Sequence, residues 1–140
     1  MPPRCIGAVL TNKMAYYHVW FATKKRKWLL QGDVEPYIKR VIGEIAKSKG
    51  IRLLDYETVV DHVHLLLEVE LDEDLSSVVK LLKGISSRRV FQEFPELKMD
   101  AETNNFWQKH YGSKTVEIGA LAVTKEYVRT QKERLDKFER

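Results

Sequence analysis

The ten residues HVHLLLEVEL, His62–Leu71, decide the fold that the sequence predicts. Four apolar residues alternate with a second set that contains two histidines: Val63, Leu65, Leu67 and Val69 against His62, His64, Leu66 and Glu68. A period of two is typical of a β-strand, and here it gives one wholly apolar face and one face that carries polar groups. We expect helices to cover the apolar face.

Further strands and helices are predicted outward from this stretch. Ile51–Val60 is a second strand, joined tightly to the first around Asp61, which indicates an antiparallel hairpin. YYHVWFAT (Tyr16–Thr23) is dense in aromatic and β-branched residues, and a fourth strand is expected around residues 111–118. Helical spacing of apolar residues predicts helices over residues 34–49, 74–94 and about 123–138, the first with Asp33 as N-cap and Gly50 after its end.

The predicted order of elements is βαββαβ followed by a C-terminal helix. This order predicts an α+β fold of the ferredoxin-like or RRM-like kind, an antiparallel sheet with helices on one face. The other sheet face is then free to bind nucleic acid, as in RNA-recognition modules.

Length and composition indicate a single domain. The chain has 140 residues, 44% of them apolar, with no repeat or linker-like tract, so we predict one domain over 1–140 with an N-terminal extension (1–14) and a C-terminal helix and tether (119–140). A net charge of +4 favours an anionic partner, either nucleic acid or a membrane surface, and does not choose between them. The lone Cys5 and the lack of a membrane-spanning run favour a soluble cytoplasmic protein.

His62 and His64 are the candidate metal ligands. They are separated by one residue on a predicted strand, so their side chains project to the same side, where two imidazoles can share one metal ion. Both lie on the polar face, which favours exposed histidines available to a ligand over core histidines. Asp61 is interpreted as a turn residue rather than a ligand.

The last predicted helix supplies the other chemical groups. Tyr127 and Gln131 are four residues apart and share a helical face. Gln131 can give its amide oxygen to the same metal, and Tyr127 is the candidate nucleophile. Two imidazole nitrogens and a neutral oxygen suit Mg²⁺ or Mn²⁺ acting as a Lewis acid, which would favour the phenolate of a tyrosine at neutral pH.

Two basic clusters are candidates for binding the phosphates of a nucleic acid. The first follows the first strand and the second lies on the helix over 74–94: Lys24, Lys25, Arg26 and Lys27, then Lys83, Arg88 and Arg89. His18 and Trp20 share a face of the first strand, where they either border the active surface or pack. Trp107 and Tyr111 are interpreted as core or dimer residues.

The chain resembles the single-tyrosine HUH transposases of the IS200/IS605 group of insertion sequences. The resemblance covers about residues 16–131 and depends on five stretches together: DHVHLLL (Asp61–Leu67), YHVW (Tyr17–Trp20), LKGISSR (Leu82–Arg88), Phe106-Trp107 through Tyr111, and YVRTQ (Tyr127–Gln131). It implies that His62, His64 and Gln131 are the metal ligands and that Tyr127 is the nucleophile.

The resemblance also implies a reaction and an assembly. A homodimer would bind imperfect single-stranded DNA hairpins at transposon ends, nick one strand, and form a 5′-phosphotyrosine with a free 3′-hydroxyl. The tyrosine helix would act in trans on the histidine pair of the partner subunit. A separate hypothesis, from the position of Gly119 just before that helix, is that this glycine is a hinge. Such a protein would be nucleoid-associated in a prokaryote.

Two other functions fit parts of the sequence. A non-catalytic or domesticated module could bind single-stranded nucleic acid with the same sheet. A metal-dependent nuclease that uses water would need the histidines but not Tyr127.

Overall fold

The computed structural model of the chain describes residues 14–98 and 105–131. Cys5, residues 1–13 of the predicted extension, and the part of the predicted last helix beyond residue 131 lie outside this range. Met14, which the prediction assigned to the extension, is the first residue of strand β1.

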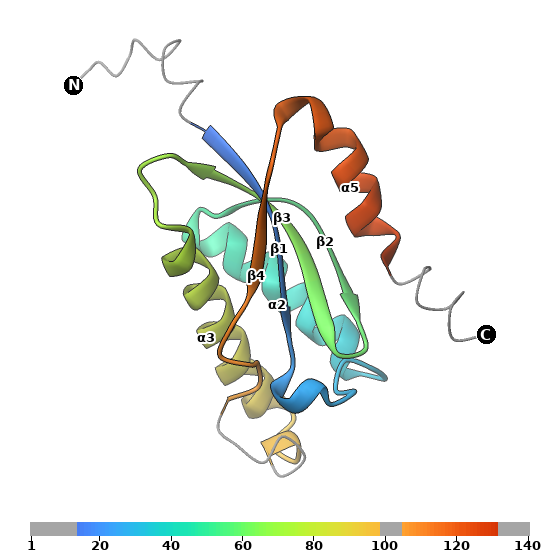
Figure 1. The fold of residues 1–140 in the computed structure, drawn as a ribbon. Coiled ribbons are helices and arrows are strands. Elements are labelled where there is room, and N and C mark those ends of the chain that lie inside the picture. Colours follow the sequence, from blue (N-terminus) through green and yellow to red (C-terminus); the bar gives the residue numbers. More distant parts are fainter. Residues whose placement is uncertain (1–13, 99–104, 132–140) are drawn as a thin grey trace.

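Four antiparallel strands form one sheet in the order β2-β3-β1-β4 (Figure 1). Their bounds are β1 (Met14–Ala22), β2 (Arg52–Val59), β3 (His62–Glu70) and β4 (Gly112–Val116). Val59 of β2 pairs with His62 of β3, so the hairpin turns through Val60 and Asp61 as expected. The two long strands, β1 and β3, are neighbours at the centre of the sheet, and the α+β fold of the ferredoxin-like kind is confirmed.

The helices with described bounds are three α-helices and two short 3-10 helices. They are η3 (Lys24–Arg26), α2 (Val34–Lys49), α3 (Leu75–Glu93), η4 (Ile118–Ala120) and α5 (Leu121–Arg129). The last helix begins two residues before its predicted start, directly after η4.

The core lies between one sheet face and the helices α2 and α3. Val63, Leu65 and Leu67 of β3 are fully buried there, together with residues of both helices such as Ile38 and Leu82. This confirms the apolar face predicted from the alternation in β3. Burial of such aliphatic side chains is the main stabilising term of the fold.

The ends of two helices show which capping signals were correct. Gly50 ends α2 in the left-handed conformation (φ 69°), as expected for a residue without Cβ. Asp74 precedes α3, and its side chain accepts a hydrogen bond from the Ser76 amide. Asp33 occupies the position before α2 but makes no side-chain cap bond, because its own backbone is already helical (φ −73°, ψ −19°).

Helix α5 packs on the opposite sheet face, so the expectation of a free face is wrong. Leu66 points away from the core formed by its neighbours Leu65 and Leu67, yet it is also fully buried. Val128 of α5 is fully buried as well, and Tyr127 of α5 contacts the ring of His64 on this face. The helix therefore covers part of the surface that the sequence assigned to nucleic acid.

Candidate active site

The two histidines of β3 converge on one point. His62 and His64 point to the same side of the strand, as predicted, and their Nε2 atoms lie 3.0 Å apart. Their rings meet edge to face, with centroids 4.8 Å apart. Two imidazole nitrogens this close can bind one divalent ion, so the donor set fits the metal that the sequence implies.

The other ring nitrogen of each histidine already has a partner. His62 Nδ1 lies 2.7 Å from Asp61 Oδ1, and His64 Nδ1 lies 2.9 Å from Nε2 of His18 on β1. Hydrogen bonds of this kind orient metal-binding histidines and leave the remaining nitrogen available to the ion. Asp61 is thus more than the turn residue that the sequence indicated, because it holds His62 and also pairs with Arg26 Nε at 3.1 Å.

His64 is buried, which corrects the expectation that both histidines of the pair are exposed, and His18 of β1 is buried as well. Each retains 8% of its surface, since α5 covers them. Burial, followed by the charges of His62 and His18, lowers the pKa of His64 to about 3. Burial, followed by Lys114, lowers the pKa of His18. His64 and His18 are therefore neutral at neutral pH. For His64, the proposed ligand, this is the form in which imidazole donates a lone pair to a metal.

Tyr127 lies over the histidine pair of its own chain. Its ring makes edge-to-face contacts with His18 (centroids 5.6 Å apart) and His64 (6.2 Å), and 41% of its surface is exposed. The structure thus brings the predicted nucleophile to the predicted ligands, although they are more than sixty positions apart in sequence.

Gln131 is not brought to the histidines in this arrangement. Its Nε2 donates to the main-chain oxygen of Tyr127 at 2.9 Å, and it does not line the pocket around the histidine pair. In the part of the chain that the structure describes, no group of three His, Cys, Asp or Glu residues is arranged to hold a metal. Gln131 as the third ligand stays a prediction.

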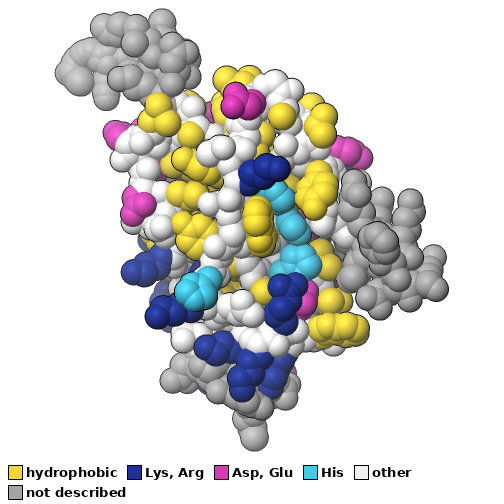
Figure 2. Space-filling view, viewed as in Figure 1, with side chains coloured by type: hydrophobic (Ala, Val, Ile, Leu, Met, Phe, Trp, Pro, Cys, Tyr) yellow, Lys and Arg dark blue, Asp and Glu magenta, His cyan; other side chains and the backbone are white. Residues whose placement is uncertain are grey.

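A pocket of about 760 Å³ opens above the histidines. Trp20 of β1 is part of its wall, and Arg26 and Lys114 also line it. A Cβ at Gly112 on β4 would lie 2.2 Å from the Trp20 indole, so glycine is needed there for the indole to lie against β4. Figure 2 shows the histidine side chains on a face that also carries Lys and Arg side chains. Glu117 lines the pocket as well, so its charged lining consists of two cations and one carboxylate. The two cations and the aromatic wall suit a nucleotide phosphate.

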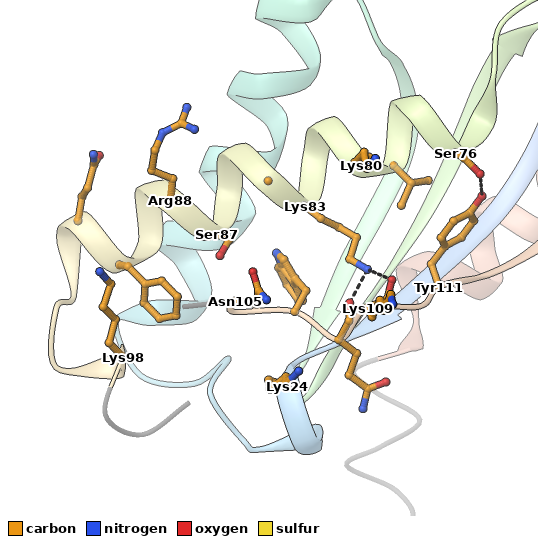
Figure 3. A pocket seen from close by; sticks show the side chains of 16 residues that line it. Lys24, Ser76, Lys80, Lys83, Ser87, Arg88, Lys98, Asn105, Lys109 and Tyr111 are labelled. Atoms are coloured by element: carbon orange, nitrogen blue, oxygen red, sulfur yellow. Dashed lines mark hydrogen bonds between the residues drawn. The ribbon is translucent and has the colours of Figure 1, made fainter. Parts of the chain in front are cut away.

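A second, basic groove runs between α3 and the segment 105–111 and has a volume of about 840 Å³ (Figure 3). Six of the described residues that line it are cationic and none is acidic: Lys24, Lys80, Lys83, Arg88, Lys98 and Lys109. Such a surface attracts a polyanion. We call it the α3 groove.

The predicted DNA-binding residues occupy different environments. Lys24 and Arg88 line the α3 groove, and Arg26 lines the pocket over the histidines. Lys83 also faces the groove, but its ammonium donates to three main-chain oxygens, those of residues 108, 109 and 110; Figure 3 shows the bonds to the first two. Arg89 instead pairs with Glu44 of α2 at 2.9 Å. Sequence position alone did not separate these roles.

Comparison with known proteins identifies the family of the chain. Residues 11–131 match the family described as transposase IS200 like. The chain belongs to the IS200-like transposase family. This transposase is 34% identical over 115 residues to the ISDra2 transposase TnpA of Deinococcus radiodurans, with 82% of each chain covered. It is 30% identical over 117 residues to the transposase for insertion sequence element IS200 of Salmonella typhimurium, covering 84% of this chain and 76% of that one.

Solved structures also resemble the transposase. A crystal structure from Deinococcus radiodurans, of a protein assigned as a transposase, has a TM-score of 0.69 and 35% identity, covering 84% of this chain and 91% of that one. A REP-associated tyrosine transposase bound to a REP hairpin shares the fold, with a TM-score of 0.57, 14% identity, and coverage of 83% and 65% respectively. Within residues 14–98 and 105–131, the transposase has no helix long and apolar enough to cross a membrane.

Proposed function

We propose that this transposase cleaves and rejoins single-stranded DNA at transposon-end hairpins through a 5′-phosphotyrosine intermediate. The observation that carries the proposal is the position of the Tyr127 ring over two histidines whose Nε2 atoms converge within 3.0 Å. The candidate nucleophile, the two candidate metal ligands and a pocket lined by Arg26 and Lys114 thus lie together on the sheet.

The proposed reaction exchanges one phosphate ester for another. The Tyr127 hydroxyl loses its proton and attacks the phosphorus, the bond from phosphorus to the 3′-oxygen breaks, and that oxygen takes up a proton. The products are a 5′-phosphotyrosine and a free 3′-hydroxyl. The phosphotyrosine ester is close in free energy to the DNA phosphodiester that it replaces. A 3′-hydroxyl can therefore attack it later, reseal the DNA and release Tyr127.

The chain's own residues would prepare this step. His62 and His64 would hold Mg²⁺ or Mn²⁺, and Gln131 would join them after its amide leaves the Tyr127 carbonyl. When bound, the metal supplies Lewis-acid activation of the phosphate and favours the tyrosine phenolate. Arg26 and Lys114 would position the phosphate from the pocket wall.

The α3 groove is the proposed site for the stem of the hairpin. Its cations and its lack of described acidic residues support this assignment. The REP-associated transposase of the same fold was solved with a hairpin. We also propose that the transposase works as a homodimer at the nucleoid, with α5 leaving its own sheet to act in trans.

An adduct assay tests the proposal. Labelled single-stranded hairpin DNA is incubated with the transposase and Mg²⁺, and the denatured products are examined for DNA linked to protein. We expect an adduct that is lost in Tyr127→Phe and with EDTA. Cleavage that persists in Tyr127→Phe would indicate a nuclease that uses water, binding without cleavage would indicate a non-catalytic module, and equal cutting of duplex DNA would contradict the substrate.

A further inference from the structure

A third histidine, His18, is buried beside the proposed metal ligands. It lies on β1, the strand next to β3. His64 pairs with Trp20 across these strands, and His18 is two residues before Trp20, so His18 and His64 are diagonal neighbours. Its Nε2 is 2.9 Å from His64 Nδ1, and the two rings stack at an angle of 26° with centroids 5.1 Å apart. The proposed chemistry gives His18 no task.

The position of one proton decides whether His64 can bind a metal. A neutral imidazole has one N–H and one lone pair. The Nε2 atom of His64 faces His62, so metal binding there requires the proton of His64 to be on Nδ1. That N–H is buried and needs an acceptor, and the partner at hydrogen-bond distance is Nε2 of His18.

We infer that His18 is a positioning residue for the metal site: in the loaded state its Nε2 accepts the Nδ1–H of His64 and so keeps the His64 lone pair on the metal side. This inference rests on the proposed function. His18 then matches the part that Asp61 plays for His62. Each ligand has one partner, a carboxylate from the turn for His62 and a neutral imidazole from the neighbouring strand for His64.

Loss of the acceptor would disfavour the ligand form of His64. With no partner for a buried Nδ1–H, His64 would gain by moving its proton to Nε2, which lies 3.0 Å from His62 Nε2 and can bond to it. That arrangement places an N–H where the metal would be.

His18 does not act as a third ligand in this geometry. Its Nε2 is occupied by His64 Nδ1, on the side of the His64 ring away from His62. The three histidines do not form a metal-binding group among the residues that the structure describes. His18 also packs on Trp20 and Tyr127, so the test must separate hydrogen bonding from packing.

Manganese affinity separates the two roles. Mn²⁺ binding is measured by titration calorimetry without DNA, on His18→Gln, whose amide oxygen reaches as far as Nε2, and on His18→Leu, which has similar bulk but no acceptor. We expect His18→Leu to weaken Mn²⁺ binding by about 10- to 100-fold, and His18→Gln to keep most of the affinity. His110→Gln is the matched control, because His110 does not line the pocket.

A second readout uses the adduct assay over a range of Mn²⁺ concentrations. His18→Leu should need more Mn²⁺ for half its maximal rate, while excess Mn²⁺ should restore most of that rate. If His18→Leu does not fold, His18→Asn replaces it, since its shorter side chain ends before the acceptor position. Wild-type Mn²⁺ affinity in a folded His18→Leu or His18→Asn protein would overturn the inference, as would an equal loss in His18→Gln.

A separate variant distinguishes this inference from the proposed function. His62→Ala should abolish Mn²⁺ binding if the histidine pair holds the metal. If His62→Ala binds Mn²⁺ like the wild type, the proposed metal site is wrong. If His62→Ala loses Mn²⁺ and His18→Leu does not, only the role of His18 is wrong.

Discussion

The burial of His64 links the stability of the protein to pH. The folded pKa of about 3 is below the ordinary value of 6.5, so between these values the unfolded chain binds a proton that the folded chain does not. The free energy of unfolding is therefore unaffected by protonation of His64 above pH 6.5, and it decreases as the pH falls from 6.5 toward 3. For the metal-free protein, we expect the free energy of unfolding in urea to be about 2 kcal/mol lower at pH 5 than at pH 7 through His64 alone.

The control for this prediction is His64→Gln, which cannot take up the proton. Its unfolding free energy should change less between pH 7 and pH 5 than that of the wild type. Equal pH dependence in the two proteins would show that His64 takes up its proton at the same pH in the folded and the unfolded state.

Gly112 is required by the position of Trp20. A Cβ at residue 112 would lie 2.2 Å from the indole, so Gly112→Ala must displace Trp20 or the β4 backbone. We expect a loss of about 1–3 kcal/mol in the free energy of unfolding, measured in urea. Gly84→Ala is the matched control, because nothing lies within 4 Å of its Cβ in α3 and alanine favours a helix. A Gly112→Ala protein as stable as the wild type would contradict the packing.

The relative positions of site residues could be predicted from local periodicity only where the residues lie on the same strand or helix. The period of a strand is enough to place His62 and His64 on one side, and that prediction is confirmed. The contact between His18 and His64 depends on how β1 pairs with β3, which no single segment of sequence specifies. Gly119 lies in η4 with open space around it, so the structure gives no steric need for a glycine there, and its hinge role stays a prediction.

At the scale of elements, Lys83 joins α3 to the segment 108–110. Its half-buried ammonium donates to three main-chain oxygens, and burial lowers its pKa. Removing it leaves those oxygens without their donor. We expect Lys83→Met to lower the free energy of unfolding by about 1–3 kcal/mol, measured in urea.

Lys80 provides the comparison, since it is exposed on the same helix and lines the same groove. Lys80→Met should leave the unfolding free energy within about 0.5 kcal/mol of the wild type. If the two substitutions cost the same stability, Lys83 does not hold the segment as the structure indicates.

The strands and helices were predicted well, while the packing of α5 was not. Alternation and helical spacing depend on neighbouring residues, so they located β3, α2 and α3 within one or two residues of their ends. Which sheet face α5 covers depends on contacts across the whole chain. Leu66 was the available signal that a helix covers this face, because it is an apolar residue among the histidines. In the structure it is fully buried on the face that α5 covers.

At the scale of the whole molecule, the proposed function assigns different tasks to two separate regions. The pocket over the histidines and the α3 groove share no lining residue. Cleavage and hairpin binding should therefore respond to different substitutions. Lys24 lines the groove while Arg26, two residues later, lines the pocket, so η3 connects the two regions.

Arg88 and Arg89 test the groove most directly, because they are adjacent on α3 and differ in surroundings. Arg88 lines the groove, whereas the guanidinium of Arg89 pairs with Glu44 of α2. Replacing either with glutamine removes the same charge, so any difference reports on position rather than on net charge. We expect Arg88→Gln to weaken hairpin binding and to reduce the slope of log affinity against log salt by about 1.

Arg89→Gln should leave both the affinity and the slope close to wild type. Fluorescence anisotropy of a labelled hairpin at several salt concentrations measures both quantities, with Tyr127→Phe as the background so that no adduct forms. Equal losses of affinity in the two variants would mean that hairpin binding depends only on the net charge of the protein. A larger loss in Arg89→Gln would place the hairpin on the α2 side of α3 and contradict its assignment to the groove.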